Sequence, residues 1–151
     1  MREIIIIIPL IFGFISGQIG KPDEWYNKLK KAPLNPPKII FPIAWTILYL
    51  LIGISYYLII NKLDLRKDNN GIFGLMIVHL IVNYSYTPLL FYMRQKLNSA
   101  IVCLMTLIIA IVLYKEFLRI DNSGLSSYLL IPYIIWLIFA NYLAWNIYYL
   151  N

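Results

Sequence analysis

Long apolar runs separated by short polar segments make up almost the whole chain. Five such runs can be marked, at about residues 4–20, 39–60, 71–93, 97–114 and 125–150. A helix needs roughly 20 mainly apolar residues to cross the hydrocarbon core of a bilayer. The pattern therefore predicts an all-α integral membrane protein, a bundle of five transmembrane helices in a single domain that spans residues 1–151.

The polar segment between the first two runs, residues 21–38, predicts a structured loop. Asp23 is placed to cap a short helix, and Trp25, Tyr26 and Leu29 then share one apolar face because they follow helical spacing. Prolines farther along the segment forbid helix and favour an extended path. These prolines are Pro33, Pro36 and Pro37. We expect this loop to lie over one end of the bundle as a cover.

Composition supports the membrane assignment and excludes other classes. Of the 151 residues, 61% are hydrophobic and only 13% are charged, whereas a soluble domain is about half apolar and about a quarter charged. The net charge of +6 comes from Lys and Arg residues scattered over short loops, which excludes a basic stripe that would follow a nucleic acid. Cys103 has no second cysteine to pair with, and with one histidine the sequence predicts no metal site.

The first apolar run could also be a secretory signal peptide. No A-x-A-like cleavage site follows it, and Gln18 stands where a small residue is expected, so we interpret the run as a retained first helix. The protein is then a multi-pass protein of a bacterial or archaeal cell membrane, or of an organelle membrane. Its 13 Lys and Arg residues divide almost evenly between the two sides, which leaves the orientation open.

The apolar runs carry few groups that could perform chemistry. None of them contains a carboxylate, which excludes a paired acid–base site within the membrane. A lone histidine on an oily helix, His79, is typical of a packing residue, and the sequence leaves its role open. Asn83 must face the bundle interior because its amide needs a partner; it either joins two helices or marks the edge of a ligand pocket, with Tyr86 on the same face.

Aromatic residues deep in two runs predict an apolar cavity. Trp45 lies one turn before Tyr49 in the second run, and Trp136 lies well inside the fifth. Ala140 and Leu143 continue the stripe of Trp136 at helical spacing, and the small Ala140 leaves a recess beside it. Such a cavity suits a flat, apolar, aromatic ligand, and ordinary core packing is the alternative.

The order and spacing of these residues resemble the TspO/MBR family. This family contains the tryptophan-rich sensory proteins of bacteria and the mitochondrial translocator protein, or peripheral-type benzodiazepine receptor. The markers are Trp25-Tyr26 with Leu29 and Lys31, Pro36-Pro37, the run 41–49 with Gly53, Asn83 with Tyr86, Pro88 and Phe91, Arg94-Gln95, and the run 130–136 with Phe139, Ala140 and Leu143.

The resemblance implies a pocket that is closed by the first loop and binds tetrapyrroles such as protoporphyrin IX or haem, or synthetic aromatic ligands. It also implies homodimers and no required cofactor. The implied ligand-binding residues are Tyr26, Trp45, Asn83, Tyr86, Trp136, Ala140 and Leu143. The implied lid residues are Trp25, Lys31, Pro36 and Pro37.

The function implied by the resemblance is sensing, regulation or handling of porphyrins. One alternative is light-dependent porphyrin degradation, with Trp45 and Trp136 as catalytic residues, and another is transport of porphyrin or sterol-like lipids. The sequence departs from the family at Leu34, Tyr84 and Tyr86, where relatives often have tryptophan. The fourth run also lacks the acidic residue of many relatives, and no basic residue completes the sterol-recognition pattern after Tyr149.

Overall fold

The computed structural model describes residues 2–63 and 70–151, and helices are the only regular secondary structure in these ranges. The polar link expected at residues 61–70 lies mostly outside the described residues. The elements are α1 (Ile4–Ile19), α2 (Glu24–Lys28), α3 (Ile40–Lys62), α4 (Asn70–Thr87), the π-helix η1 (Pro88–Tyr92), α5 (Lys96–Ile120), α6 (Leu125–Tyr128) and α7 (Ile131–Leu150).

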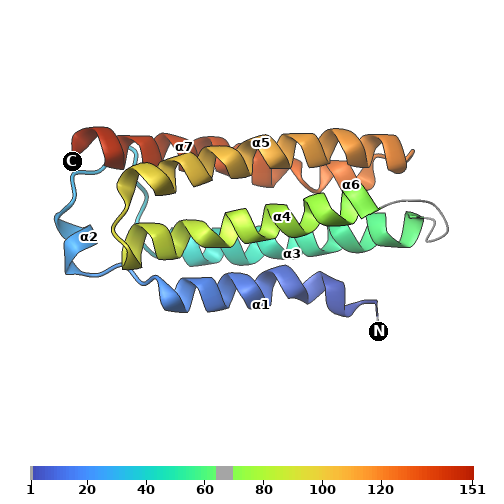
Figure 1. Ribbon diagram of the computed structural model, residues 1–151, viewed down its shortest axis with the longest axis horizontal. Coiled ribbons are helices and arrows are strands. Elements are labelled where there is room, and N and C mark those ends of the chain that lie inside the picture. Colours follow the sequence, from blue (N-terminus) through green and yellow to red (C-terminus); the bar gives the residue numbers. More distant parts are fainter. Residues whose placement is uncertain (1, 64–69) are drawn as a thin grey trace.

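Five long helices lie side by side and form a membrane bundle, as the sequence predicts (Figure 1). Four apolar segments, those of α3, α4–η1, α5 and α6–α7, are long enough to cross a bilayer, and the shorter α1 packs against α3. The short helix α2 lies at the same end as the end of α7 and the turn into α5, opposite the start of α1 (Figure 1). Helices α3 and α7 contact each other much less than α1 contacts α3 or α5 contacts α7.

The loop between α1 and α3 is structured as predicted. The Asp23 side chain caps α2 by accepting a 3.0 Å hydrogen bond from the backbone N–H of Tyr26. Its other carboxylate oxygen lies 3.2 Å from the guanidinium of Arg94. These two contacts, the N–H of Tyr26 first, lower the pKa of Asp23. Leu29 follows α2 as its C-cap instead of continuing the helix.

One predicted helix boundary in the second half of the chain is wrong. The fourth apolar run ends at about residue 114, but α5 is helical through Ile120, because hydropathy marks where a helix leaves the membrane and not where its backbone ends. The fifth run, 125–150, is one apolar segment as predicted, and a break at Leu129 and Leu130 divides it into α6 and α7. Pro132 lies in the first turn of α7, where its missing N–H costs little.

Glycines let α1 and α3 approach each other closely. A Cβ on Gly13 would lie 2.2 Å from the ring of Tyr49, and a Cβ on Gly53 would lie 1.9 Å from the carbonyl oxygen of Ile6. Gly13 and Gly17 have the G-x-x-x-G spacing that lets membrane helices approach closely, and Gly13 packs against α3 within the chain. Gly17, the second one, faces open space.

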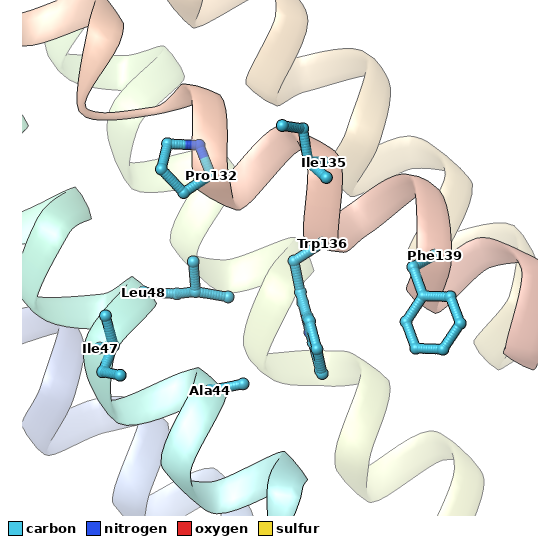
Figure 2. Close-up of a pocket in the computed structure, with 7 residues that line it drawn as sticks. All are labelled: Ala44, Ile47, Leu48, Pro132, Ile135, Trp136 and Phe139. Carbon is cyan, nitrogen blue, oxygen red and sulfur yellow. The ribbon is translucent and has the colours of Figure 1, made fainter. Parts of the chain in front are cut away.

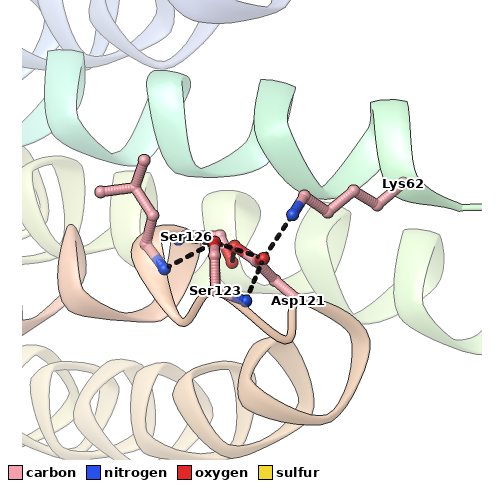
Figure 3. Close-up of polar contacts among 5 residues, drawn as sticks. Lys62, Asp121, Ser123 and Ser126 are labelled. Atoms are coloured by element: carbon pink, nitrogen blue, oxygen red, sulfur yellow. Dashed lines mark hydrogen bonds and ion pairs between the residues drawn. The ribbon is translucent and has the colours of Figure 1, made fainter.

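A buried carboxylate ties α3 to the turn between α5 and α6. Asp121 is 1% exposed and accepts hydrogen bonds from Lys62 and from the N–H and hydroxyl groups of Ser123 and Ser126 (Figure 3). Lys62 and the serine donors together lower the pKa of Asp121. Ser55 extends the tie, since its hydroxyl donates to the carbonyl oxygen of Ser126 at 2.6 Å. This network fixes the end of the bundle that lies opposite α2.

Candidate functional site

An aromatic cluster lies where α3 faces α7, and we call this region the α3–α7 seam. The ring of Trp45 lies 6.4 Å from Trp136 and 6.2 Å from Tyr133 of α7, edge to face in both cases. It also stacks on Tyr49 at 5.2 Å. The two deep tryptophans of the sequence analysis therefore come together in space, although they lie on helices that share few contacts.

A cavity of about 340 Å³ opens in the same seam. Its walls are apolar side chains from α3 and α7, with Trp136 standing between the two helices above Ala44 (Figure 2). The lining residues are Ala44, Ile47, Leu48, Pro132, Ile135, Trp136 and Phe139. Ile47 and Ile135 are 55% and 62% exposed, so the cavity faces the lipid side of the bundle.

Trp136 is the predicted ligand-binding residue that lines this cavity. Its indole Nε1 is buried and has no hydrogen-bond acceptor among the described residues. A buried N–H without an acceptor costs about 1–3 kcal/mol. A ligand that carries an acceptor, and that shifts this ring slightly on entry, would remove the cost.

Asn83 joins two helices, which was the first of the two roles expected for it. Its side-chain amide, 5% exposed on α4, donates to the hydroxyl of Tyr49 on α3 at 3.4 Å. Because Tyr49 stacks on Trp45, Asn83 supports the aromatic cluster from behind. Its contact with a ligand stays a prediction.

The remaining predicted residues lie nearer to α2, in a region that we call the lid end. Tyr26 packs with Leu90 and Ile147, and Tyr86 packs against this cluster. The rings of Tyr26 and Phe91 meet edge to face at 4.9 Å. Ala140 packs against a group of small buried residues that Tyr86 also touches, and Leu143 is 5% exposed. None of these residues lines the cavity of the seam.

Lys31 holds the lid together from within. Its ammonium donates to the carbonyl oxygens of Tyr26 and Leu29 at 2.8 and 3.2 Å and lies 4.6 Å from the centre of the Tyr26 ring. Desolvation and the nearby Lys38 lower the pKa of Lys31. The side chain therefore closes the C-terminal end of α2, a role that the sequence analysis did not assign to it.

The other lid residues take part in the fold of the loop. The guanidinium of Arg94 lies 5.5 Å from the ring of Trp25. The carbonyl oxygen of Pro36 accepts a 3.3 Å hydrogen bond from Asn35, and that of Pro37 accepts a 3.0 Å bond from the N–H of Ile40 at the start of α3.

Asn151 fastens the loop to the end of α7, and sequence reasoning missed it. Its side-chain oxygen accepts from the N–H of Lys30 at 2.8 Å, and its side-chain nitrogen donates to the carbonyl oxygen of Lys30 at 2.8 Å. The ammonium of Lys96 donates to the carbonyl oxygen of Asn151 at 2.8 Å. Lys30 and Asn151 lie so far apart in the sequence that no local pattern predicts their contact.

His79 has two partners that the sequence also did not show. Its ring nitrogens lie 2.7 Å from the hydroxyl of Tyr56 and 2.8 Å from that of Tyr133. A buried imidazole needs a partner on each nitrogen, and this requirement is the signal that could have prompted a search for two hydroxyl groups. Across residues 2–63 and 70–151, no three His, Cys, Asp or Glu side chains gather as metal ligands would.

Comparison with known proteins gives one consistent result. A profile of the TspO/MBR family matches residues 5–150. The tryptophan-rich protein TspO of Bacillus cereus is 29% identical over 99% of this chain and 97% of its own length. The tryptophan-rich sensory protein of Cereibacter sphaeroides is 31% identical over 80% of this chain and 73% of its own length. The translocator protein of Bos taurus is 31% identical over 93% of this chain and 85% of its own length.

The family match over residues 5–150 runs through the membrane helices and the loop that carries α2, and so includes both the seam with Trp45 and Trp136 and the lid end with Tyr26 and Tyr86. The chain therefore belongs to the TspO/MBR family of integral membrane proteins.

Proposed function

We propose that this protein binds a tetrapyrrole, of the protoporphyrin IX or haem type, in the α3–α7 seam. The observation that carries the proposal is the indole N–H of Trp136, which has no acceptor among the described residues, beside an apolar cavity lined by aliphatic side chains together with Trp136 and Phe139. A tetrapyrrole offers a wide flat π-surface to Trp45 and Trp136, and its ring nitrogens or carboxylates can accept a hydrogen bond.

The loose packing between α3 and α7 supports entry from the bilayer. The two helices share few contacts, and the cavity lies on the lipid-facing side. A cavity of about 340 Å³ is at the lower end of the range for small-molecule sites. Binding therefore includes a widening of the seam, in which the rings of Trp45 and Trp136 move apart.

Binding serves sensing or regulation in this proposal. The names of the relatives, tryptophan-rich sensory protein and translocator protein, support a role in which ligand occupancy or ligand movement is the output. Homodimers and synthetic aromatic ligands follow from the family membership as further expectations.

Quenching of tryptophan fluorescence by protoporphyrin IX, in protein held in lipid nanodiscs, tests the site. Trp136→Phe keeps an aromatic wall but removes the N–H, and we expect about tenfold weaker binding for the loss of one hydrogen bond. Trp145→Phe is the matched control, because Trp145 lies on the same helix and stacks on Tyr149 away from the cavity. Equal affinities for the two variants would contradict the assignment.

Light-dependent degradation of the bound porphyrin is a second candidate. The contact between Trp45 and Trp136 favours it, because two adjacent indoles can supply electrons to an excited ligand. Illumination of the complex in oxygen should then produce a new absorption spectrum, and Trp45→Phe should abolish the product. A complex that keeps its spectrum under light would exclude this activity.

A further inference from the structure

His79 holds two tyrosines from different helices in the bundle interior. Tyr56 comes from α3 and Tyr133 from α7, and each hydroxyl lies within hydrogen-bond distance of one nitrogen of the ring. His79 and Tyr133 are 0% exposed and Tyr56 is 3% exposed. A neutral imidazole has one N–H donor and one acceptor nitrogen, so one hydroxyl donates to the ring and the other accepts from it. The site thus places a phenol against a base, out of contact with water.

Three tyrosines surround Trp45 and His79, and they differ in their neighbours. Tyr49 stacks on Trp45, but its hydroxyl contacts the amide nitrogen of Asn83, which is not a base. Tyr56 contacts the base His79, and its ring packs on His79 and Phe117. Tyr133 has both neighbours, since its ring meets Trp45 at 6.2 Å and its hydroxyl meets His79 at 2.8 Å.

We propose that Trp45, Tyr133 and His79 form a redox relay that moves an oxidising equivalent from the seam to Tyr133. Oxidation of a phenol requires loss of its proton as well as an electron, because the phenol radical cation is a very strong acid. Tyr133 is the tyrosine of the three that has an electron acceptor on one side and a proton acceptor on the other. His79 is the proton acceptor of the relay, a role that histidine performs in many sites.

The oxidant is a photo-excited tetrapyrrole in the seam, so this part rests on the proposed function. The excited tetrapyrrole takes one electron from Trp45 and becomes a radical anion, leaving a tryptophan radical cation. Tyr133 passes one electron to Trp45 and its phenolic proton to Nε2 of His79. The products are a neutral tyrosyl radical and an imidazolium whose Nδ1–H donates to the oxygen of Tyr56. Return of the electron from the tetrapyrrole, together with return of the proton from Nε2 of His79, restores the O–H bond of Tyr133.

The test has one arm without any ligand. An ultraviolet laser pulse ionises tryptophan in the protein in nanodiscs, nitrous oxide removes the ejected electron, and transient absorption follows the tryptophan and tyrosyl radicals. We expect a tyrosyl signal to rise as the tryptophan radical decays. Tyr133→Phe and Trp45→Phe should each remove most of that signal, and Tyr133→Phe should lengthen the tryptophan radical lifetime at least tenfold. His79→Gln should slow the rise at least tenfold while Tyr133 is still present.

Tyr49→Phe is the matched control. It removes one hydroxyl from the same buried cluster, one that contacts Asn83 and not His79, and it should leave the tyrosyl signal within about twofold of the wild type. Size-exclusion profiles should show that the near-isosteric variants stay folded. An unchanged signal in Tyr133→Phe, or an equal loss in Tyr49→Phe, would overturn the relay.

The second arm replaces the ultraviolet pulse by visible excitation of added protoporphyrin IX. The same variant pattern should appear in this arm. A tyrosyl signal in the ultraviolet arm without one in the porphyrin arm supports the relay and contradicts binding in the seam. The absence of a tyrosyl signal in both arms overturns the relay, whatever the porphyrin titration shows.

Discussion

The α3–α7 seam and the lid end are built in opposite ways. In the seam, two helices share few contacts, an apolar cavity remains open, and the indole N–H of Trp136 has no acceptor in the part of the chain that the structure describes. At the lid end, Tyr26 is buried among Leu90, Ile147 and Phe91, and the loop is fastened by hydrogen bonds to Asn151. An N–H without an acceptor beside open space favours a ligand in the seam, whereas the hydrogen-bonded groups of the lid end stabilise the loop.

This difference divides the residues that the family resemblance places in one pocket. Trp45 and Trp136 belong to the seam, which Asn83 supports from α4 through Tyr49, whereas Tyr26 and Tyr86 belong to the lid end. The seam is the region where we expect a ligand to touch the protein first.

Filling the cavity should give the largest effect on binding. Ala44→Leu adds a side chain beneath Trp136, so we expect protoporphyrin IX affinity to fall by more than tenfold in a fluorescence titration. Ala140→Leu is the comparison at the lid end; overpacking against its buried neighbours should lower the free energy of unfolding by about 1–3 kcal/mol and change affinity less. The reverse order of affinities would move the ligand to the lid end.

Detaching α2 from the bundle should have the next largest effect. Tyr26→Ala removes a ring that is 6% exposed and its edge-to-face contact with Phe91. We expect a loss of about 2–3 kcal/mol in the free energy of unfolding and faster dissociation of protoporphyrin IX, measured by denaturation in detergent and by stopped-flow. Tyr26→Phe is the control, and it should stay close to the wild type. A dissociation rate that is unaffected by Tyr26→Ala would show that the loop does not cover the ligand.

Loss of the Asn151 contacts should free the loop without weakening the bundle. Two exposed hydrogen bonds contribute about 1–2 kcal/mol in total, so Asn151→Ala should raise the rate of tryptic cleavage at the loop lysines about tenfold. Asn146→Ala is matched to it, because Asn146 makes a similar 2.8 Å bond to the carbonyl oxygen of Tyr142 but none to the loop. Equal cleavage rates in the two variants would contradict a fastening role for Asn151.

Acid should loosen the lid end by a smaller amount. The pKa of Asp23 in the folded protein is lowered from its ordinary value of 3.8. The Asp23 carboxylate therefore contributes its full stabilisation above pH 3.8, and this stabilisation is lost as the pH falls through the lowered pKa. Hydrogen exchange measures this effect. The backbone N–H of Tyr26 should lose its protection from exchange below about pH 4. Asp23→Asn should show no such step. A step of the same size in that variant would assign it to another carboxylate.

The sequence predicted the bundle better than the site. Hydropathy located all five helices, and the capping role of Asp23 followed from its position before Trp25 and Tyr26. The helical extension of α5 through Ile120 was missed because polar residues outside the membrane do not end a helix. The break before α7 was missed because the run 125–150 is apolar on both sides of it.

The partners of the site residues could not be predicted, because they are set by packing between distant helices. Nothing local relates Tyr133 to His79 or Asn151 to Lys30. The stripe of Trp136, Ala140 and Leu143 was correct as helical spacing, yet Ala140 faces small residues and not the cavity. Side chains one turn apart on a helix can face different neighbours, here a cavity for Trp136 and small buried residues for Ala140. Helical spacing alone does not distinguish these two environments.

A structure of the protein with bound protoporphyrin IX tests the central claim most directly. We expect the tetrapyrrole between α3 and α7, in contact with Trp136 and Ala44, with the indole N–H of Trp136 donating to an acceptor on the ligand. A tetrapyrrole enclosed beneath the loop between Tyr26 and Tyr86, with the seam unchanged, would contradict the account.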